Sequence, residues 1–325
     1  MTLSEVYKRA VRYGIENDPR GGDAVTRYLQ DREKQFDDLK EKDKEFFDKE
    51  SLTNPYADTR ILNGTGDEEV TAALVGIDIE TPEILLADNL RIKGSRIDAI
   101  IAHHPEGMPY RNLHDVMSMQ ADILRTFGVP INVAEGLMED RISEVKRKLM
   151  PVNTSRAVDA ARLLEFPFMC VHTPADNMVA SYLQNLFDTN KPYALCNVLD
   201  MLMEIEEYKD AARSFSAPNI LLGGPQRKAG KIFVDMTGGT EGSKDLFQVF
   251  SSSGINTIVG MHLSEEHKKE AEKYHINVVI AGHISSDNLG MNLLFDKIFA
   301  EGTAKSNIVL TGCSGFRRIA RDIVK

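Results

Sequence analysis

Short apolar runs alternate with amphipathic stretches along most of the chain after residue 70. In the first half the apolar runs are 70–77 (VTAALVGI), 97–102 (IDAIIA) and 166–171 (FPFMCV), and helical periodicity covers 113–127, 133–149 and 178–188. The second half has apolar runs at 231–236, 255–260, 276–281 and 306–311 and helical patterns at 242–251, 264–273 and 288–300. Strands that alternate with helices are typical of mainly parallel sheets. The pattern therefore predicts an α/β fold of two related lobes, each a mainly parallel sheet flanked by helices.

The first 54 residues have a different pattern. Residues 23–48 are dominated by charge, and a thin apolar stripe runs through them at near-helical spacing. The stripe consists of Val25, Leu29, Phe36, Leu39, Phe46 and Phe47. A Pro19-to-Gly22 turn precedes the segment, and Asn54-Pro55 follows it, where the residue before proline is pushed out of the helical region. We expect a solvated amphipathic helix, and residues 1–54 as an N-terminal helical extension.

Composition narrows the class of protein. The 325 residues carry 39 Lys and Arg against 49 Asp and Glu, and a net charge of -10 disfavours nucleic acid as a partner. No stretch approaches the roughly 20 apolar residues of a membrane span, and the N-terminus lacks the apolar core of a signal peptide. We expect a cytoplasmic protein without a membrane partner. The three cysteines, Cys170, Cys196 and Cys313, share no metal-binding spacing and are interpreted as reduced core residues.

Histidines gather directly after the predicted strands. Five of the eight do so: His103, His104, His172, His262 and His283. The informative strings are IDAIIAHHPEG (97–107), FPFMCVHTPADN (166–177) and INVVIAGHISSDN (276–288), and the last two both contain His-x3-Asp. In open α/β sheets, ligands bind in the crevice at the carboxyl ends of the strands. The histidines therefore mark a candidate site.

The His-x3-Asp spacing suits chelation of a metal ion. If a helix follows each strand, residues four apart lie on one face, so the imidazole and the carboxylate can approach one ion together. A single such pair is more often a cap or a hydrogen-bonded pair. Two pairs together with His-His-Pro at a third strand end are harder to explain structurally, because polar groups beside apolar strands carry a desolvation cost. Nitrogen and oxygen donors without thiolate favour ions such as Zn, Fe, Mn or Ni.

These strings resemble the GTP cyclohydrolase type 2 homologues, also called the Nif-three-like family (NGG-interacting factor three). The resemblance spans roughly residues 55–300 and implies two divalent metal ions per chain, Zn, Fe or Mn. The ligands that it implies are His103, His104, Asp176, His283 and Asp287. The family usually has glutamate at the position of Asp287, so the shared carboxylate is one methylene shorter here. The resemblance also implies a ring-shaped homo-oligomer, typically a hexamer.

The domain organisation follows from these motifs. We expect residues 55–188 to form a first lobe with His-His-Pro and His-x3-Asp, and 189–325 a second lobe with Gly-His-x3-Asp, the metal site lying between them. Two ions can acidify a water molecule and stabilise an oxyanion, so the hypothesis is hydrolysis of a small, nucleotide-like substrate, of the GTP cyclohydrolase type by resemblance. His172, Glu106 and His262 are the candidate catalytic residues, as proton carriers or ligand-orienting groups. The alternatives are a non-catalytic metal-binding scaffold or regulatory ring, and a metal storage or delivery protein.

Three further features have both a functional and a structural interpretation. Asp78 ends another predicted strand and either lies near the site or caps a turn. The segment 234–245 (VDMTGGTEGSKD) either cradles a phosphate with the amides of Gly238, Gly239 and Gly242 or is an ordinary turn, and it lacks the spacing of a P-loop. Arg317 and Arg318 either meet an anionic substrate or cover the surface.

Overall fold

The computed structural model describes residues 1–301 and 308–321, and its first sheet has five strands in the order β1-β4-β3-β2-β9. The strands are β1 (Arg60–Asn63), β2 (Ala72–Gly76), β3 (Ala99–Ala102), β4 (Phe168–Cys170) and β9 (Val309–Cys313). β4, β3, β2 and β9 run parallel, and β1 pairs antiparallel with β4 at one edge. β2 and β3 are apolar and buried throughout, as expected for a parallel sheet covered on both faces.

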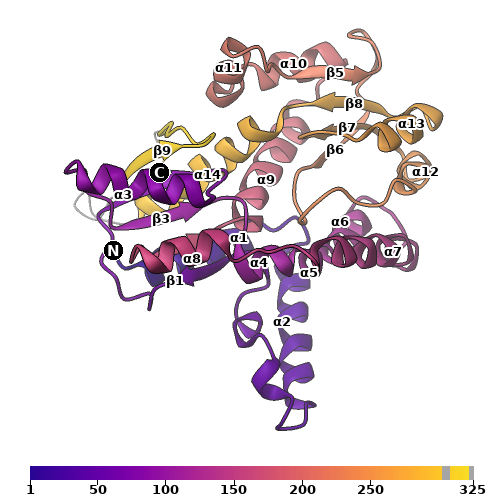
Figure 1. Cartoon of the computed structure of the whole chain (residues 1–325). Coiled ribbons are helices and arrows are strands. Elements are labelled where there is room, and N and C mark those ends of the chain that lie inside the picture. Colours follow the sequence, from indigo (N-terminus) through magenta and orange to yellow (C-terminus); the bar gives the residue numbers. More distant parts are fainter. Residues whose placement is uncertain (302–307, 322–325) are drawn as a thin grey trace.

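The second sheet repeats the plan of the first. Its order is β5-β8-β7-β6, with β5 (Asn219–Leu222), β6 (Lys231–Asp235), β7 (Ile255–Gly260) and β8 (Asn277–Ile280). β6, β7 and β8 are parallel, and β5 is antiparallel to β8. In each sheet the third parallel strand leads directly into a helix of 18 residues, α9 (Thr173–Asn190) after β4 and α14 (His283–Ala300) after β8. The two related α/β units predicted from the sequence are therefore confirmed (Figure 1).

Helices cover both faces of the first sheet because its side chains alternate between them. Ala73 and Val75 of β2 pack with α1 (Leu3–Glu16), α9 and α14, whereas Leu74 packs with α3 (Thr81–Ile92) and α8 (Arg156–Leu163). α1 begins at a capping box formed by Thr2 and Glu5. Its buried residues belong to the same apolar cluster as β2, so α1 is part of the core of the first unit.

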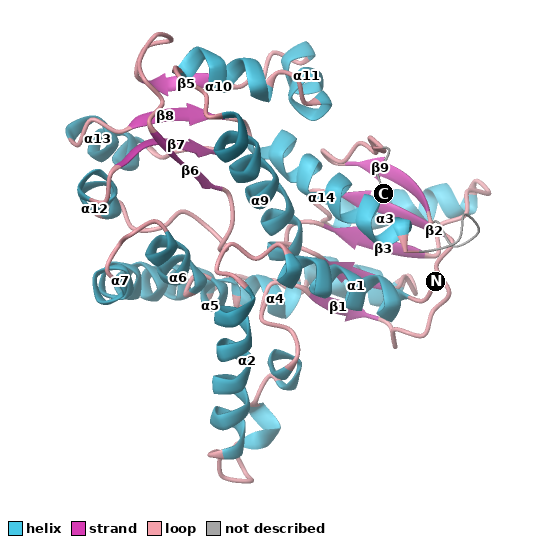
Figure 2. Cartoon of the chain, turned by 180° about the vertical axis from the view of Figure 1, so that it is seen from behind, coloured by secondary structure: helices cyan, strands magenta, loops and turns pink. Residues whose placement is uncertain are grey.

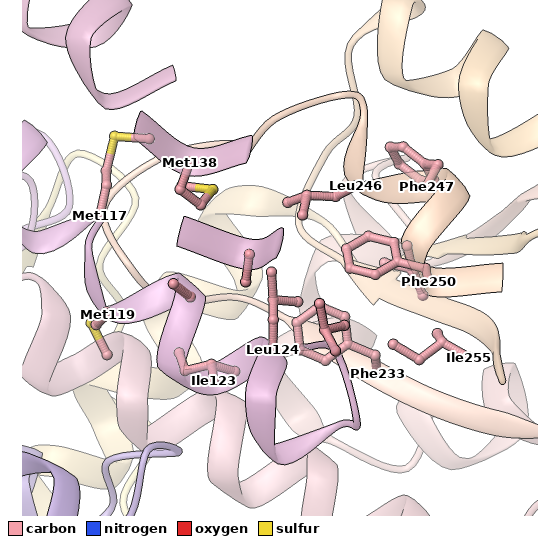
Figure 3. Packing of buried hydrophobic residues seen from close by; sticks show 14 of the residues in the cluster. Met117, Met119, Ile123, Leu124, Met138, Phe233, Leu246, Phe247, Phe250 and Ile255 are labelled. Atoms are coloured by element: carbon pink, nitrogen blue, oxygen red, sulfur yellow. The ribbon is translucent and has the colours of Figure 1, made fainter. Parts of the chain in front are cut away.

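The segment between β3 and β4 joins the two units. It contains α4 (Gly107–Arg111), α5 (Leu113–Val116), α6 (Met119–Thr126) and α7 (Ile131–Leu149). α5, α6 and α7 pack against the second sheet and against α12 (Leu246–Ser252) and α13 (Glu265–Lys273). Figure 3 shows Ile123 and Leu124 of α6 beside Phe233 and Phe250 in this cluster. α10 (Leu195–Leu202) lies with α9 over the other face of the second sheet, and α11 (Glu206–Arg213) follows it.

The N-terminal segment differs in part from the expectation. One helix over 23–48 is wrong, because α2 (Gly22–Asp37) ends early and the chain turns back through the short 3₁₀ helices η1 (Lys44–Phe46) and η2 (Lys49–Leu52). The rings of Phe36 and Phe47 lie 5.2 Å apart, so the apolar stripe closes on itself across the turn. α2 projects from the body of the protein (Figure 1), and only Ala24 and Val25 of it are buried.

The C-terminal segment returns to the first unit. β9 pairs with β2 in the five-stranded sheet, although the expected division at 188/189 assigns it to the second lobe. The expected strand 306–311 overlaps β9, while its residues 306 and 307 lie outside the described ones. A hydrophobic pattern identifies a strand but not the strand with which it pairs. Here α14 leads the chain from the second sheet back to the first. Among the residues that the structure describes, no helix is both long and apolar enough to cross a membrane.

Candidate metal centre

The expected metal ligands lie at the end of β3 and on the first turns of α9 and α14. β3 and β4 are neighbouring parallel strands, so their carboxyl ends meet at one edge of the sheet, where His103 and His104 follow β3. α9 and α14 begin beside this edge and pack against each other (Figure 2). Their close approach needs a glycine at position 290, because a Cβ there would lie 2.4 Å from the carbonyl oxygen of Ala175.

The five side chains expected to bind metal converge. The Nε2 atom of His103 lies 3.4 Å from Oδ1 of Asp176 and 3.6 Å from Oδ1 of Asp287. The Nε2 atoms of His104 and His283 each lie 3.4 Å from Oδ2 of Asp287. Two groups of ligand atoms within 4.8 Å of one another result, His103 with Asp176 and Asp287, and His104 with His283 and Asp287. Asp287 belongs to both groups.

The two adjacent histidines are held by their outer nitrogens. Nδ1 of His103 donates to the carbonyl oxygen of Val171 at 3.0 Å, which leaves the lone pair of Nε2 directed at the carboxylates in the neutral tautomer. Nδ1 of His104 lies 2.7 Å from Oδ1 of Asp78. A hydrogen bond at the far nitrogen is the usual way in which proteins orient metal-binding histidines. Asp78 therefore does contact the site, through His104.

His172 is oriented in the same way by a buried carboxylate. Its Nδ1 lies 2.8 Å from Oδ2 of Asp58, which also accepts a 2.6 Å hydrogen bond from the hydroxyl of Thr173. His172 forms a third group of possible ligand atoms, with His103 and His104. Burial opposes the ionisation of Asp58, but the hydrogen bonds from His172 and Thr173 and the nearby charge of His172 together outweigh this and lower the pKa of Asp58. Asp58 is thus a charged support behind His172.

The buried atoms at the centre fit a cation. Nε2 of His103 and both carboxylate oxygens of Asp287 are buried and have no hydrogen-bond partner. Buried polar atoms in proteins are nearly always paired, and an unpaired buried carboxylate costs several kcal/mol. These three atoms face one another and the remaining ligands, and all are donors that divalent ions accept. The arrangement is therefore the one expected of a metal site.

The protonation of the site residues reflects this crowding. Burial lowers the pKa of His103 to about 4. Burial opposes the charged form of His104 too, but the nearby carboxylates of Asp287 and Asp78 outweigh it and raise the pKa of His104 to about 10. Burial raises the pKa of Asp176 to about 7, whereas the histidines hold the pKa of Asp287 well below its usual range despite its burial. Asp287 is thus the fixed negative charge around which the cluster is built.

The other two candidate catalytic residues come from the two different units of the fold. Glu106 precedes α4, and burial together with Glu80 raises its pKa to about 7. His262 follows β7, and its ring centroid lies 5.0 Å from that of His283. Nδ1 of His262 lies 3.5 Å from Oε1 of Glu241, an oxygen that also accepts a 2.8 Å hydrogen bond from the amide of Ser264. Neither Glu106 nor His262 belongs to the three groups of possible ligand atoms.

Asp58 and Glu241 were not among the residues singled out from the sequence. Asp58 precedes β1, a short edge strand with no alternating pattern, so nothing in its neighbours predicts that its carboxylate lies under the centre. Glu241 lies inside the glycine-rich segment, whose expected function depends on backbone amides rather than on side chains. Pairing with a histidine from another element is the common feature of both residues, and it exists only in the folded chain.

Residues 236–245 of the glycine-rich segment form a loop after β6. α12 begins only at Leu246, and Gly238 and Gly239 adopt positive φ angles of 98° and 88°. The amide of Gln120 donates to the carbonyl oxygens of Gly238 and Thr240 at 2.6 and 2.7 Å, which ties the loop to α6. The expected helix start at residue 242 is therefore wrong, because the glycines extend the loop.

Arg317 and Arg318 are engaged away from the centre. Arg317 pairs with Asp210 and Arg318 pairs with Asp296, so the surface-covering interpretation of both is favoured. All three cysteines are free; only Cys170 is fully buried, while Cys196 and Cys313 are half-buried.

A cavity of about 850 Å³ opens beside the centre. His104, His172, His283, Asp176 and Asp287 contribute to its wall, as do Glu106 and His262. The volume is in the range of pockets that bind small molecules. Room for a substrate therefore exists next to the candidate ligands.

Comparisons with known proteins support the fold. No family model matches the chain, and no curated protein matches it. Among solved structures, a NIF3 superfamily protein from Sphaerobacter thermophilus is 24% identical with a TM-score of 0.68, over 80% of this chain and 92% of that one. Reduced HcgD from Methanocaldococcus jannaschii is 12% identical with a TM-score of 0.50, over 78% of this chain and 87% of that one. The expected likeness to Nif-three-like proteins is confirmed at the level of the fold.

Proposed function

We propose that this protein is a Nif-three-like protein that binds two divalent metal ions and uses them to hydrolyse a small molecule. The observation that carries the proposal is the set of buried, unpaired donor atoms on His103 and Asp287, directed toward one another beside a cavity of substrate size. A scaffold with structural ions needs a closed shell of protein ligands. A cavity that reaches the ligands favours catalysis.

The two groups of ligand atoms suggest how the ions are shared. One ion would be held by His103, Asp176 and Asp287, and the other by His104, His283 and Asp287. Asp287 would then bridge, since one of its oxygens faces His103 and the other faces His104 and His283. Imidazole and carboxylate donors suit Zn, Fe or Mn.

Two bound ions would supply an acidified water molecule and positive charge for the developing oxyanion. The chain itself would contribute orientation and proton transfer. Asp58 and Asp78 hold His172 and His104 in position through their Nδ1 atoms. His262, supported by Glu241, and Glu106 line the cavity and are placed to carry protons to or from a substrate.

Two further parts of the proposal are a ring-shaped homohexamer, which the resemblance implies, and a cytoplasmic location, which the sequence pattern predicts. The hexamer is measured directly by light scattering on purified protein. A nucleotide such as GTP is the substrate that the family name suggests, and it heads the list of compounds to test.

The test is elemental analysis of protein purified without chelator, followed by a hydrolase screen with the metals found. The wild type should contain close to two ions per chain, and His104→Ala and Asp287→Ala should contain far less. His275→Asn is the matched control, because His275 is exposed and precedes β8, at the opposite end of the sheet from the site. Metal content that neither substitution changes would refute the site, and two ions with no hydrolysis of any compound would favour the scaffold.

A further inference from the structure

The cavity beside the metal centre has an apolar wall on the side away from the ions. α6 supplies Ile123 and Leu124, Phe127 follows it, and the second sheet and α12 supply Phe233 and Phe250. The rings of Phe127 and Phe233 meet edge to face with centroids 4.7 Å apart. Figure 3 shows Phe233 and Phe250 in this buried cluster, and their ring centroids lie 5.7 Å apart. Phe127 is half-buried, whereas Ile123, Leu124, Phe233 and Phe250 are almost fully buried, so the wall is apolar but exposes little of these rings.

The charged groups around the cavity are mainly acidic. Eight carboxylates line it, against one arginine and one lysine. Two of the carboxylates, Asp176 and Asp287, belong to the metal centre, and the other six are Asp78, Glu80, Glu106, Asp188, Asp235 and Glu241. The four positive charges of two divalent ions would lie at the metal centre itself. Outside the metal centre, the cavity would carry no excess of positive charge.

Each of the two cations acts on a neighbouring group of the protein. Nζ of Lys231 donates to the carbonyl oxygen of Phe127 at 2.6 Å and lies 5.4 Å from the centre of its ring. Burial raises the pKa of Glu106, and the positive charge of Arg156 opposes part of this rise. Glu241 is also oriented, by the amide of Ser264, and its pKa is lowered by the hydrogen bond from His262 although burial opposes this. The acidic lining is therefore built into the fold.

We infer that the substrate places its reacting group at the metal ions and a largely apolar body, uncharged or cationic, against this apolar wall. The inference rests on the proposed function, because the ions define which end of the substrate reacts. It argues against a nucleoside triphosphate bound with its base at the ions. The phosphates would then extend into a region lined by phenylalanine and carboxylate, where like charges repel strongly.

The experiment uses hydroxamates, which chelate metal ions at one end and carry a variable group at the other. Three probes share a biphenyl body that ends in hydrogen, trimethylammonium or phosphonate, and acetohydroxamate is the head alone. Dissociation constants are measured on the metal-loaded full-length protein by calorimetry. The uncharged and cationic probes should bind at least about tenfold more tightly than the phosphonate probe. Both should also bind more tightly than acetohydroxamate.

Two variants test the source of the preference. Glu241→Gln should narrow the gap between the uncharged and phosphonate probes, whereas Glu272→Gln, the same change at an exposed position on α13 outside the cavity, should leave it unchanged. Equal affinity for the uncharged and phosphonate probes would overturn the inference. So would biphenyl probes that bind no better than acetohydroxamate.

A second measurement separates this inference from the proposed function. Biphenylmethanol and biphenylmethylphosphonate lack the chelating head, and their binding to metal-free protein is followed by NMR. Preference for the alcohol should persist without metal. If hydroxamates fail to bind and no metal is found, while the alcohol is still preferred, the hydrolase proposal falls and the assignment of the cavity stands. If the alcohol is not preferred, the assignment of the cavity falls.

Discussion

Gly290 is the position at which sequence and structure make opposite predictions. It lies inside α14, where replacing an exposed glycine with alanine stabilises a helix by about 1 kcal/mol. In the folded protein a Cβ at this position would lie 2.4 Å from the carbonyl oxygen of Ala175 and 3.0 Å from its carbonyl carbon. Both atoms belong to the backbone of α9, so no side chain can rotate away. Gly290→Ala must therefore move one helix relative to the other.

The size of the effect follows from these distances. The contact is about 1 Å shorter than ordinary van der Waals contact allows. Overpacking of this kind costs about 1 to 3 kcal/mol, which the gain in helix propensity only partly offsets. We expect a net loss of roughly 1 kcal/mol in the free energy of unfolding. Ala175 precedes Asp176, and Gly290 lies three residues after Asp287, so the displacement falls on the ligands. Metal sites tolerate shifts of only about 0.2 Å, and metal content should fall.

The assay compares Gly290→Ala with Gly136→Ala. Gly136 is exposed in the interior of α7, and a Cβ there would meet nothing within 4 Å. Urea midpoints of the metal-free proteins should therefore shift in opposite directions, upward for Gly136→Ala and downward for Gly290→Ala. Elemental analysis should find the metal content reduced only in Gly290→Ala. A Gly290→Ala protein that is as stable as Gly136→Ala and retains two ions would refute the crossing of α9 and α14 at this residue.

Three further outcomes are expected. Asp78→Asn removes the carboxylate that orients His104, a proposed ligand, and metal affinity by competitive chelation should fall about 10-fold to 100-fold with little change in stability, because Asp78 is exposed. An unchanged affinity would show that Asp78 does not support the site. Removing metal with a chelator should lower the melting temperature, because metal at 100 times its Kd stabilises the folded chain by about 2.7 kcal/mol. Equal melting temperatures with and without metal would contradict the site. Partial burial opposes ionisation of Asp98, but hydrogen bonds from the Thr71 amide and hydroxyl outweigh it and lower the pKa of Asp98. Asp98→Asn should thus lower the free energy of unfolding by about 1 kcal/mol at pH 7. The loss should become progressively smaller below about pH 4, because the stabilising carboxylate of the wild type is then protonated. A difference in urea midpoint between variant and wild type that is equal at pH 7 and pH 3 would disprove this.

Most strands of the two sheets could be predicted because they are continuous apolar runs. The run 255–260 coincides with β7, and 97–102 and 276–281 each contain the observed strand within one or two residues. A strand buried on both faces must be apolar at every position, so its signal is local. β1 and β5 are edge strands with partly exposed side chains, and no such signal marks them.

The segment 113–127 shows the limit of periodicity. Its apolar spacing predicts one helix, yet the structure has α5 and α6, separated at Met117 and Ser118. These residues lie between two strands of the first sheet but pack against the second sheet. The break between α5 and α6 redirects the chain toward Phe233 and Phe250. Which sheet a helix covers depends on partners distant in sequence.

The sequence by itself determined the residue types of the candidate site and their positions at strand ends, because His-His-Pro and His-x3-Asp are local strings that follow apolar runs. Tertiary structure alone decided that Asp287 stands between His103, His104 and His283, that Asp58 lies behind His172, and that β9 returns to the first sheet. Proximity of this kind arises from the packing of α9 on α14, which depends on the shape of both helices at once. The order of residues in the sequence gives the chemistry of each side chain but not the distances between side chains.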